Sequence, residues 1–157
     1  GGNQVCTVGK FDVHPNLVNV VAARVQLTLD VRNTDEDLLK QAEHEISHYF
    51  GDLETTFGVS ISSRQLARFE PVQFDPRVID CVERICTDIN GDTIRMPSGA
   101  GHDAQMLARV CPTAMIFVPS KDGISHNEIE DAKPEHIAAG CNVLLHAMLG
   151  RAGVVGA

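Results

Sequence analysis

The sequence has no apolar run that approaches the roughly 20 residues of a membrane-spanning helix. It also has no excess of positive charge, because 13 basic side chains stand against 21 acidic ones. The formal net charge of -8 opposes binding to nucleic acids and to anionic membranes. No charged segment followed by an apolar one opens the chain, so we expect no signal or transit peptide. These absences predict a cytoplasmic protein whose partners include neither a membrane nor a nucleic acid.

The chain also lacks a C-x-x-C pair. Its cysteines are odd in number and scattered, and four of them lie inside apolar stretches. Free cysteine in such surroundings is usually buried, and a reducing compartment keeps it unpaired. We therefore predict buried thiols at Cys6, Cys81, Cys86, Cys111 and Cys141.

No internal repeat and no low-complexity segment occurs in the 157 residues. Hydrophobic residues make up 43% of the chain and charged residues 22%, both near the averages for globular proteins. Domains of about 100–150 residues are the commonest size. Length and composition are therefore those of an ordinary globular domain.

The first part of the chain shows both strand and helix periodicity. Apolar residues take the odd positions from Ala23 to Arg32, as in a strand with one buried face. A less regular run over 5–13 precedes turn residues, so we expect it to pair with that strand. Helical spacing then runs from a capping residue at Thr34 to Gly51. A further alternating run over 59–69 predicts another strand.

Prolines then interrupt the pattern and divide the chain into residues 1–73 and 74–157. After this boundary, apolar spacing predicts one helix that ends at Asn90-Gly91 and one that begins near Pro134. Between them we expect a glycine-rich loop, a short helix and a buried strand over 113–118. The resulting order predicts an α/β fold made of two unequal units.

The residues His44-Glu45-Ile46-Ser47-His48 match H-E-x-x-H, in which two histidines bind zinc and the glutamate activates water. On the predicted helix, both histidines point roughly 180–220° away from the centre of the apolar stripe. A zinc protease instead needs both histidines in an enclosed cleft with a third ligand. We interpret this pair as facing solvent and rank a zinc protease last among the functions.

Three segments, taken together, are the strongest functional signal. They are Thr7-Val8-Gly9 with Pro15 to Val21 and Asp30-Val31-Arg32, then Ser98 to Ala104, and then Phe117 to Ser120 with Gly123 to His126. With the Ala138-Ala139-Gly140 helix, they extend over nearly the whole chain. In this order and spacing, the chain resembles the N-carbamoyl-L-amino-acid hydrolase and allantoate amidohydrolase family of metal-dependent amidohydrolases.

The resemblance implies a partial two-domain metallo-amidohydrolase fold. Family members have a catalytic domain with a two-metal site, interrupted in sequence by a smaller lid domain that also forms the dimer contact. Residues 1–73 resemble the latter part of the lid, with α+β structure, and residues 74–157 resemble the C-terminal part of the α/β catalytic domain. A homodimer formed through the lid domain is therefore implied.

The resemblance also assigns candidate binding residues. His126 matches the last metal ligand, and a neutral imidazole suits zinc, manganese, cobalt or nickel. Arg32 matches a lid arginine that holds the substrate carboxylate, and Asn19 matches a lid asparagine that hydrogen-bonds the substrate. Gly101 and His102 match a loop that contacts the carboxylate end of the substrate. Without the resemblance, the same residues would be interpreted as surface charges, turn residues and an ordinary loop.

In the family, the other metal ligands and the catalytic glutamate precede the matched portion, so no catalytic residue is assigned here. The implied reaction is hydrolysis of a linear C–N bond in a small carbamoyl or ureido substrate, assisted by two divalent metal ions. An N-carbamoyl-L-amino acid is the first expectation, with allantoate and ureidoglycolate as alternatives. The competing class is a catalytically inert truncated protein or dimerisation module.

Overall fold

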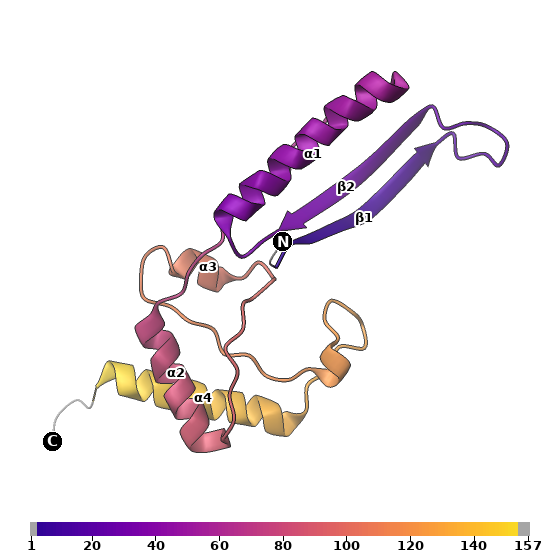
Figure 1. Ribbon diagram of the computed structural model, residues 1–157. Helices are drawn as coiled ribbons and strands as arrows, with labels where there is room; N and C mark the ends of the chain where they lie inside the picture. Colours follow the sequence, from indigo (N-terminus) through magenta and orange to yellow (C-terminus); the bar gives the residue numbers. More distant parts are fainter. Residues whose placement is uncertain (1–2, 154–157) are drawn as a thin grey trace. The chain divides into compact units, whose positions relative to one another are not determined.

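The computed structural model describes residues 3–153. The chain divides into two compact units between Pro71 and Val72, close to the boundary predicted between residues 73 and 74. The assignment of these units to a lid and a catalytic domain stays a prediction. A two-stranded sheet combines with helices along the chain, so the predicted mixed α/β class is confirmed (Figure 1).

The first unit contains an antiparallel hairpin of β1 (Val5–His14) and β2 (Arg24–Arg32). The register shifts between Val8 and Lys10, so Gly9 has no residue paired with it. One extra residue inverts the alternation of a strand, because successive side chains point to opposite faces. The bulge therefore brings four apolar cross-strand pairs to one face: Cys6–Val31, Val8–Leu29, Phe11–Leu27 and Val13–Val25.

The helix that follows the hairpin is α1 (Glu36–Phe57), and it differs at both ends from the prediction. Its N-cap is Asp35, whose side chain accepts hydrogen bonds from two backbone N–H groups of the first turn. The predicted cap, Thr34, is wrong by one residue. Gly51 does not end the helix, which continues to Phe57. The residue that caps its C-terminus is Gly58, whose φ of 64° is left-handed. A helix favours glycine at such a position because a Cβ would be strained there.

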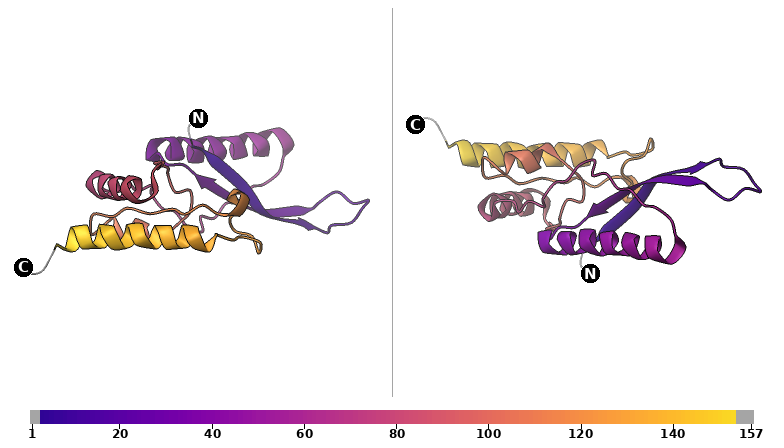
Figure 2. Two further views of the ribbon diagram at one scale, coloured as in Figure 1. Left: turned by 90° about the horizontal axis from the view of Figure 1, so that it is seen from below. Right: turned by 90° about the horizontal axis from the view of Figure 1, so that it is seen from above.

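α1 packs along β2 within the first unit (Figures 1 and 2). Leu39 is buried, whereas Leu27 of β2 remains 44% exposed. The segment after α1 is tied back to the helix by Arg68, which donates to Glu36 at 2.8 Å and to Glu43 at 3.0 Å. The helix therefore covers the apolar face of the hairpin only in part.

The second unit contains α2 (Pro76–Asn90), α3 (Asp103–Leu107), a single 3₁₀ turn η1 (Lys121–Gly123) and α4 (Pro134–Ala152). The three predicted helices are thus confirmed. α2 packs against α4. Asp75 caps α2 by accepting hydrogen bonds from two backbone N–H groups. The buried apolar residues of this unit are few within the described structure: Ala104, Val143 and Ala147.

Two predicted strands, 59–69 and 113–118, are wrong for the described structure. A strand is defined by hydrogen bonds to a neighbouring strand. Within residues 3–153 the sheet contains β1 and β2, and neither predicted strand pairs with it. The alternation over 59–69 and the continuous apolar run over 113–118 are typical of strands, but a pairing neighbour is missing from the described part of the chain.

The cysteines also differ from the prediction. Cys6, Cys111 and Cys141 are exposed, and Cys81 and Cys86 are half-buried. The prediction of buried thiols is therefore wrong, because the apolar stretches around these residues have little to pack against. In the part of the chain that the structure describes, no helix is both long and apolar enough to span a bilayer.

The accessible surface of the chain is 12426 Å². By the scaling of surface with mass in folded proteins, two separate compact units of these sizes would together expose about 9,300 Å². The observed area therefore exceeds even the area of two fully separated compact units. Taken together, the two units therefore bury less surface than compact units of their size do.

Candidate functional site

Arg32, the last residue of β2, forms a two-point ion pair with Asp30. Its Nε donates to Oδ1 of Asp30 at 2.8 Å, and its Nη2 donates to Oδ2 at 2.6 Å. Residues two apart on a strand share a face, which places the two side chains together. These hydrogen bonds hold the pKa of Asp30 below its ordinary value and raise the pKa of Arg32. The predicted carboxylate-binding residue is therefore already oriented by a carboxylate of its own strand.

Asn19 lies in the loop between β1 and β2. The backbone N–H of Val20 donates to the carbonyl of Leu17 at 3.5 Å, which closes a turn around this position. The side chain of Asn19 is exposed, and its amide makes no hydrogen bond to another residue of the described range. An amide offers both a donor and an acceptor, so Asn19 can bind a polar ligand.

The hairpin keeps Asn19 and Arg32 apart. The loop that carries Asn19 joins the strands at one end of the hairpin, and Arg32 ends β2 at the other (Figure 1). At about 3.4 Å per residue, the nine residues of β2 span about 27 Å. This length exceeds the small carbamoyl or ureido substrate that the sequence resemblance implies. One copy of the chain therefore cannot bring both residues to the same molecule.

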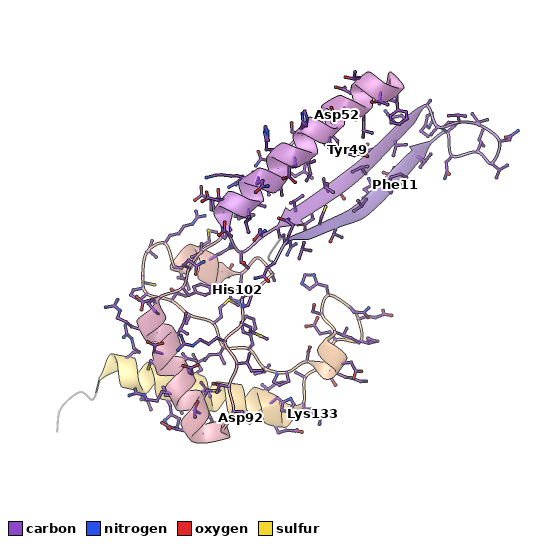
Figure 3. All side chains as sticks on the ribbon, in the orientation of Figure 1. Phe11, Tyr49, Asp52, Asp92, His102 and Lys133 are labelled. Carbon is purple, nitrogen blue, oxygen red and sulfur yellow. The ribbon has the colours of Figure 1, made fainter. Side chains whose placement is uncertain are left out.

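His102 is the N-cap of α3 in the second unit (Figure 3). Its Nδ1 accepts a hydrogen bond from the backbone N–H of Ala104 at 3.0 Å. A neutral imidazole has one acceptor nitrogen and one donor nitrogen, so this bond places the hydrogen on Nε2. A Cβ built on the preceding Gly101 would meet no atom within 4 Å. The loop thus presents an N–H donor on the exposed His102, next to a glycine with open space at its own Cα.

His126 lies in the loop between η1 and α4 and has a left-handed φ of 57°. This conformation costs roughly 1–2 kcal/mol for a residue with a side chain. The imidazole is exposed and makes no hydrogen bond within the described structure, so either ring nitrogen fits a divalent metal ion. The backbone N–H of His126 donates to Oε2 of Glu130 at 2.9 Å.

No group of three or more His, Cys, Asp or Glu side chains among residues 3–153 is arranged to hold a metal ion. His126 therefore fits the role of one ligand in a shared metal site, to which other ligands must be added. The histidines of the H-E-x-x-H sequence, His44 and His48, are both exposed. Their predicted orientation toward solvent is confirmed.

Two partners of the candidate residues were not identified from the sequence. Asp30 could have been, because it carries the opposite charge to Arg32 and lies two residues before it on a predicted strand. Glu130 offered no such signal, since it contacts His126 across an irregular loop without a fixed period.

Comparison with known proteins adds independent findings. Residues 4–150 match the family described as Peptidase family M20/M25/M40. An N-carbamoyl-L-amino-acid amidohydrolase of Rhizobium meliloti is 37% identical over 148 residues, which cover 94% of this chain and 36% of that protein. An allantoate amidohydrolase of Bacillus subtilis (strain 168) is 32% identical over 138 residues, which cover 88% of this chain and 34% of that protein. The chain thus spans about a third of the length of these curated relatives.

A solved structure is also similar to this chain. It is described as an amidase of the hydantoinase/carbamoylase family from Burkholderia multivorans. The identity is 46% and the TM-score is 0.86, and the match covers 95% of this chain and 36% of that protein. The residues matched by the family, 4–150, include all five candidate positions: Asn19, Arg32, Gly101, His102 and His126.

Proposed function

The chain belongs to Peptidase family M20/M25/M40, and from that membership we propose that it forms the C-terminal part of a metal-dependent amidohydrolase. The observation that carries the proposal is the 46% identity to the Burkholderia multivorans amidase, which extends over 95% of the chain. The proposed reaction is hydrolysis of a linear C–N bond in a carbamoyl or ureido group. The proposed substrate is an N-carbamoyl-L-amino acid, and allantoate and ureidoglycolate are the alternatives.

In this proposal the chain mainly binds and orients the substrate. The planar guanidinium of Arg32, held by Asp30, recognises the substrate carboxylate by charged hydrogen bonds. The Nε2–H of His102, beside the open space at Gly101, donates a hydrogen bond to the same end. Fixing the carboxylate end in this way places the distant carbamoyl group for attack.

His126 is the proposed metal ligand of this chain. Its exposed imidazole suits zinc, manganese, cobalt or nickel. When two such ions are bound in a hydrolytic site, they polarise the scissile carbonyl and supply hydroxide near neutral pH. Because the described residues provide no group of three metal ligands, the proposal takes the remaining ligands from outside them.

The geometry of the hairpin supports a homodimer as the working form. Asn19 and Arg32 lie at opposite ends of a strand about 27 Å long, so the two residues reach one small substrate only from different copies. The unit that carries both residues is the proposed lid, residues 1–73. We therefore infer that two protomers, joined through this unit, contribute to each site.

The test is a chimera in which these 157 residues replace the matching segment of the Burkholderia multivorans amidase. The chimera is expected to bind two metal ions per protomer and to release ammonia from N-carbamoyl-L-amino acids. Allantoate and ureidoglycolate are assayed in parallel to decide between the substrates. His126→Ala should remove one metal ion and the activity, whereas His146→Ala, at an exposed position of α4, should change neither. A folded, metal-loaded chimera that cleaves none of the three substrates would contradict the proposal.

A second candidate function is an inert dimerisation module. It is favoured by the lack, among the described residues, of a group that could hold a metal ion. Supplying the chain with a separately expressed remainder of the amidase distinguishes the two candidates. The amidohydrolase proposal expects activity when the two pieces are combined. The inert module predicts that the chain associates with itself and that no activity arises from the mixture.

A further inference from the structure

The loop that presents His126 is closed on itself. At its base, the backbone N–H of Lys121 donates to the carbonyl of Asp131 at 2.7 Å. Near its end, the N–H of Glu130 donates to the carbonyl of Asn127 at 3.0 Å, and Oδ1 of Asn127 accepts from the N–H of Ile129 at 3.1 Å. These bonds turn the chain back, so the side chain of Glu130 is directed toward His126.

Glu130 makes a specific contact with the backbone of His126. Its Oε2 accepts the N–H of His126 at 2.9 Å, a hydrogen bond to a charged acceptor and so stronger than one between neutral groups. His126 has the left-handed φ of 57° at the same position. Because the residue is exposed, packing does not impose that conformation. Within residues 3–153, the hydrogen bond to Glu130 is the interaction of His126 that favours it.

We propose that Glu130 is a positioning residue: its carboxylate holds His126 in the left-handed conformation and thereby sets the direction of the imidazole. The inference rests on the proposed function, in which that imidazole binds a metal ion. The direction of a Cα–Cβ bond depends on φ, so a change from left-handed to right-handed backbone would turn the ring away. Metal ligands tolerate little displacement, and groups that orient them commonly change metal affinity 10- to 100-fold when they are lost.

The first experiment measures the geometry in the 157-residue chain without metal. Scalar couplings across φ and the intraresidue Hα–HN cross-peak of His126 report whether the residue is left-handed. Wild type and Glu130→Gln should both show the left-handed signature, because the amide oxygen of glutamine still accepts the hydrogen bond. Glu130→Ala should lose it. Glu128→Ala, on the same loop and exposed, is the matched control and should behave as wild type. An unchanged φ in Glu130→Ala would overturn the inference.

The second experiment measures metal affinity in the chimera by competition with a chelator. Glu130→Ala should weaken one of the two metal sites about 10- to 100-fold. Glu130→Gln should restore most of the affinity, and Glu128→Ala should match the wild type. Equal affinities in Glu130→Ala and wild type, while His126→Ala loses a metal ion, would reject the role of Glu130 alone. If His126→Ala also keeps both metal ions, the proposed ligand is wrong, so the two failures can be told apart.

Discussion

The carboxylate of Asp30 determines how Arg32 can meet a ligand. An arginine side chain has about 2 kcal/mol of rotamer entropy, part of which is lost when it binds. Asp30 already restricts the guanidinium through two hydrogen bonds, so less freedom is lost when a substrate arrives. Both side chains remain about half exposed, at 45% for Arg32 and 50% for Asp30. The pair is therefore accessible to a ligand and contributes more to orientation than to stability.

Arg32→Ala should raise KM about 10- to 100-fold in the chimera. Hydrogen bonds to a charged group contribute about 1.5–3 kcal/mol, and about 1.4 kcal/mol corresponds to a tenfold change in affinity. kcat should change little, because the carboxylate end is bound similarly in the substrate and in the transition state. Arg24→Ala is the matched control, since Arg24 begins the strand that Arg32 ends. An unchanged KM in Arg32→Ala would remove this residue from the site.

The ion pair also predicts the titration of Asp30. Its folded-state pKa is lowered, so the pair stabilises the chain above the unfolded value of about 3.9 and loses this effect as the pH falls through the lowered pKa. The contribution should be at most about 1 kcal/mol because both side chains are solvated. Carbon-13 NMR of the Asp30 carboxyl should show a midpoint below about 3.9 in wild type and in Arg24→Ala. In Arg32→Ala the midpoint should rise; the same midpoint in all three proteins would argue against the pair in solution.

At the scale of elements, periodicity predicted the hairpin and the helices but not the details that align them. The run before the first turn looked irregular because Cys6 and Val8 occupy even positions, whereas Phe11 and Val13 occupy odd ones. The bulge at Gly9 accounts for the change of phase. Alternation over 59–69 and a continuous apolar run over 113–118 also predicted strands that did not form. Alternation reports which face prefers burial, whereas a strand also requires a hydrogen-bonding neighbour.

The position of the α1 cap can be tested with two adjacent substitutions. Asp35→Ala should destabilise the first turn of α1 by about 1 kcal/mol, because two backbone N–H groups lose their acceptor. Thr34→Ala should have little effect on the helix, since the hydroxyl of Thr34 instead accepts a hydrogen bond from Asn3 at 3.1 Å. Amide hydrogen exchange in the first turn measures the difference. Faster exchange in Thr34→Ala than in Asp35→Ala would favour the cap predicted from the sequence.

Two glycines of α4 should respond oppositely to alanine. Gly150→Ala should stabilise the helix by roughly 0.5–1 kcal/mol, because no atom lies within 4 Å of the new Cβ. Gly140→Ala should destabilise the chain, because its Cβ would lie 2.6 Å from Cγ1 of Val118. Overpacking of this kind typically costs about 1–3 kcal/mol, which exceeds the gain in helix propensity. Urea midpoints at a constant slope measure both changes. A raised midpoint in Gly140→Ala would show that Val118 moves aside readily.

At the scale of the whole molecule, the fold class and the organisation in two units could be predicted from the sequence. The burial of individual side chains could not. The thiols were predicted to be buried because their neighbours are apolar, but burial also requires a second surface to pack against. The described structure provides little such packing surface, and large side chains such as Phe11 and Leu66 remain 61% and 71% exposed. The candidate binding residues are likewise incomplete by themselves.

Arg32, the proposed carboxylate-binding residue, lies in one unit, and His126, the proposed metal ligand, lies in the other. The described residues do not supply the further ligands that a metal site needs.

This exposed surface leads to a prediction for the chain by itself. The accessible surface exceeds the estimate for two compact units by about 3,000 Å², and many large apolar side chains are exposed. Contiguous apolar patches beyond a few hundred Å² usually mark interaction surfaces. The isolated chain should therefore bind an apolar fluorescent dye strongly and associate with itself at micromolar concentrations. The chimera, in which the remainder of the amidase supplies the packing partner, should bind the dye no more than the Burkholderia multivorans enzyme does. Dye binding by the isolated chain as weak as that of the chimera would show that each unit closes its own core in solution, against this prediction.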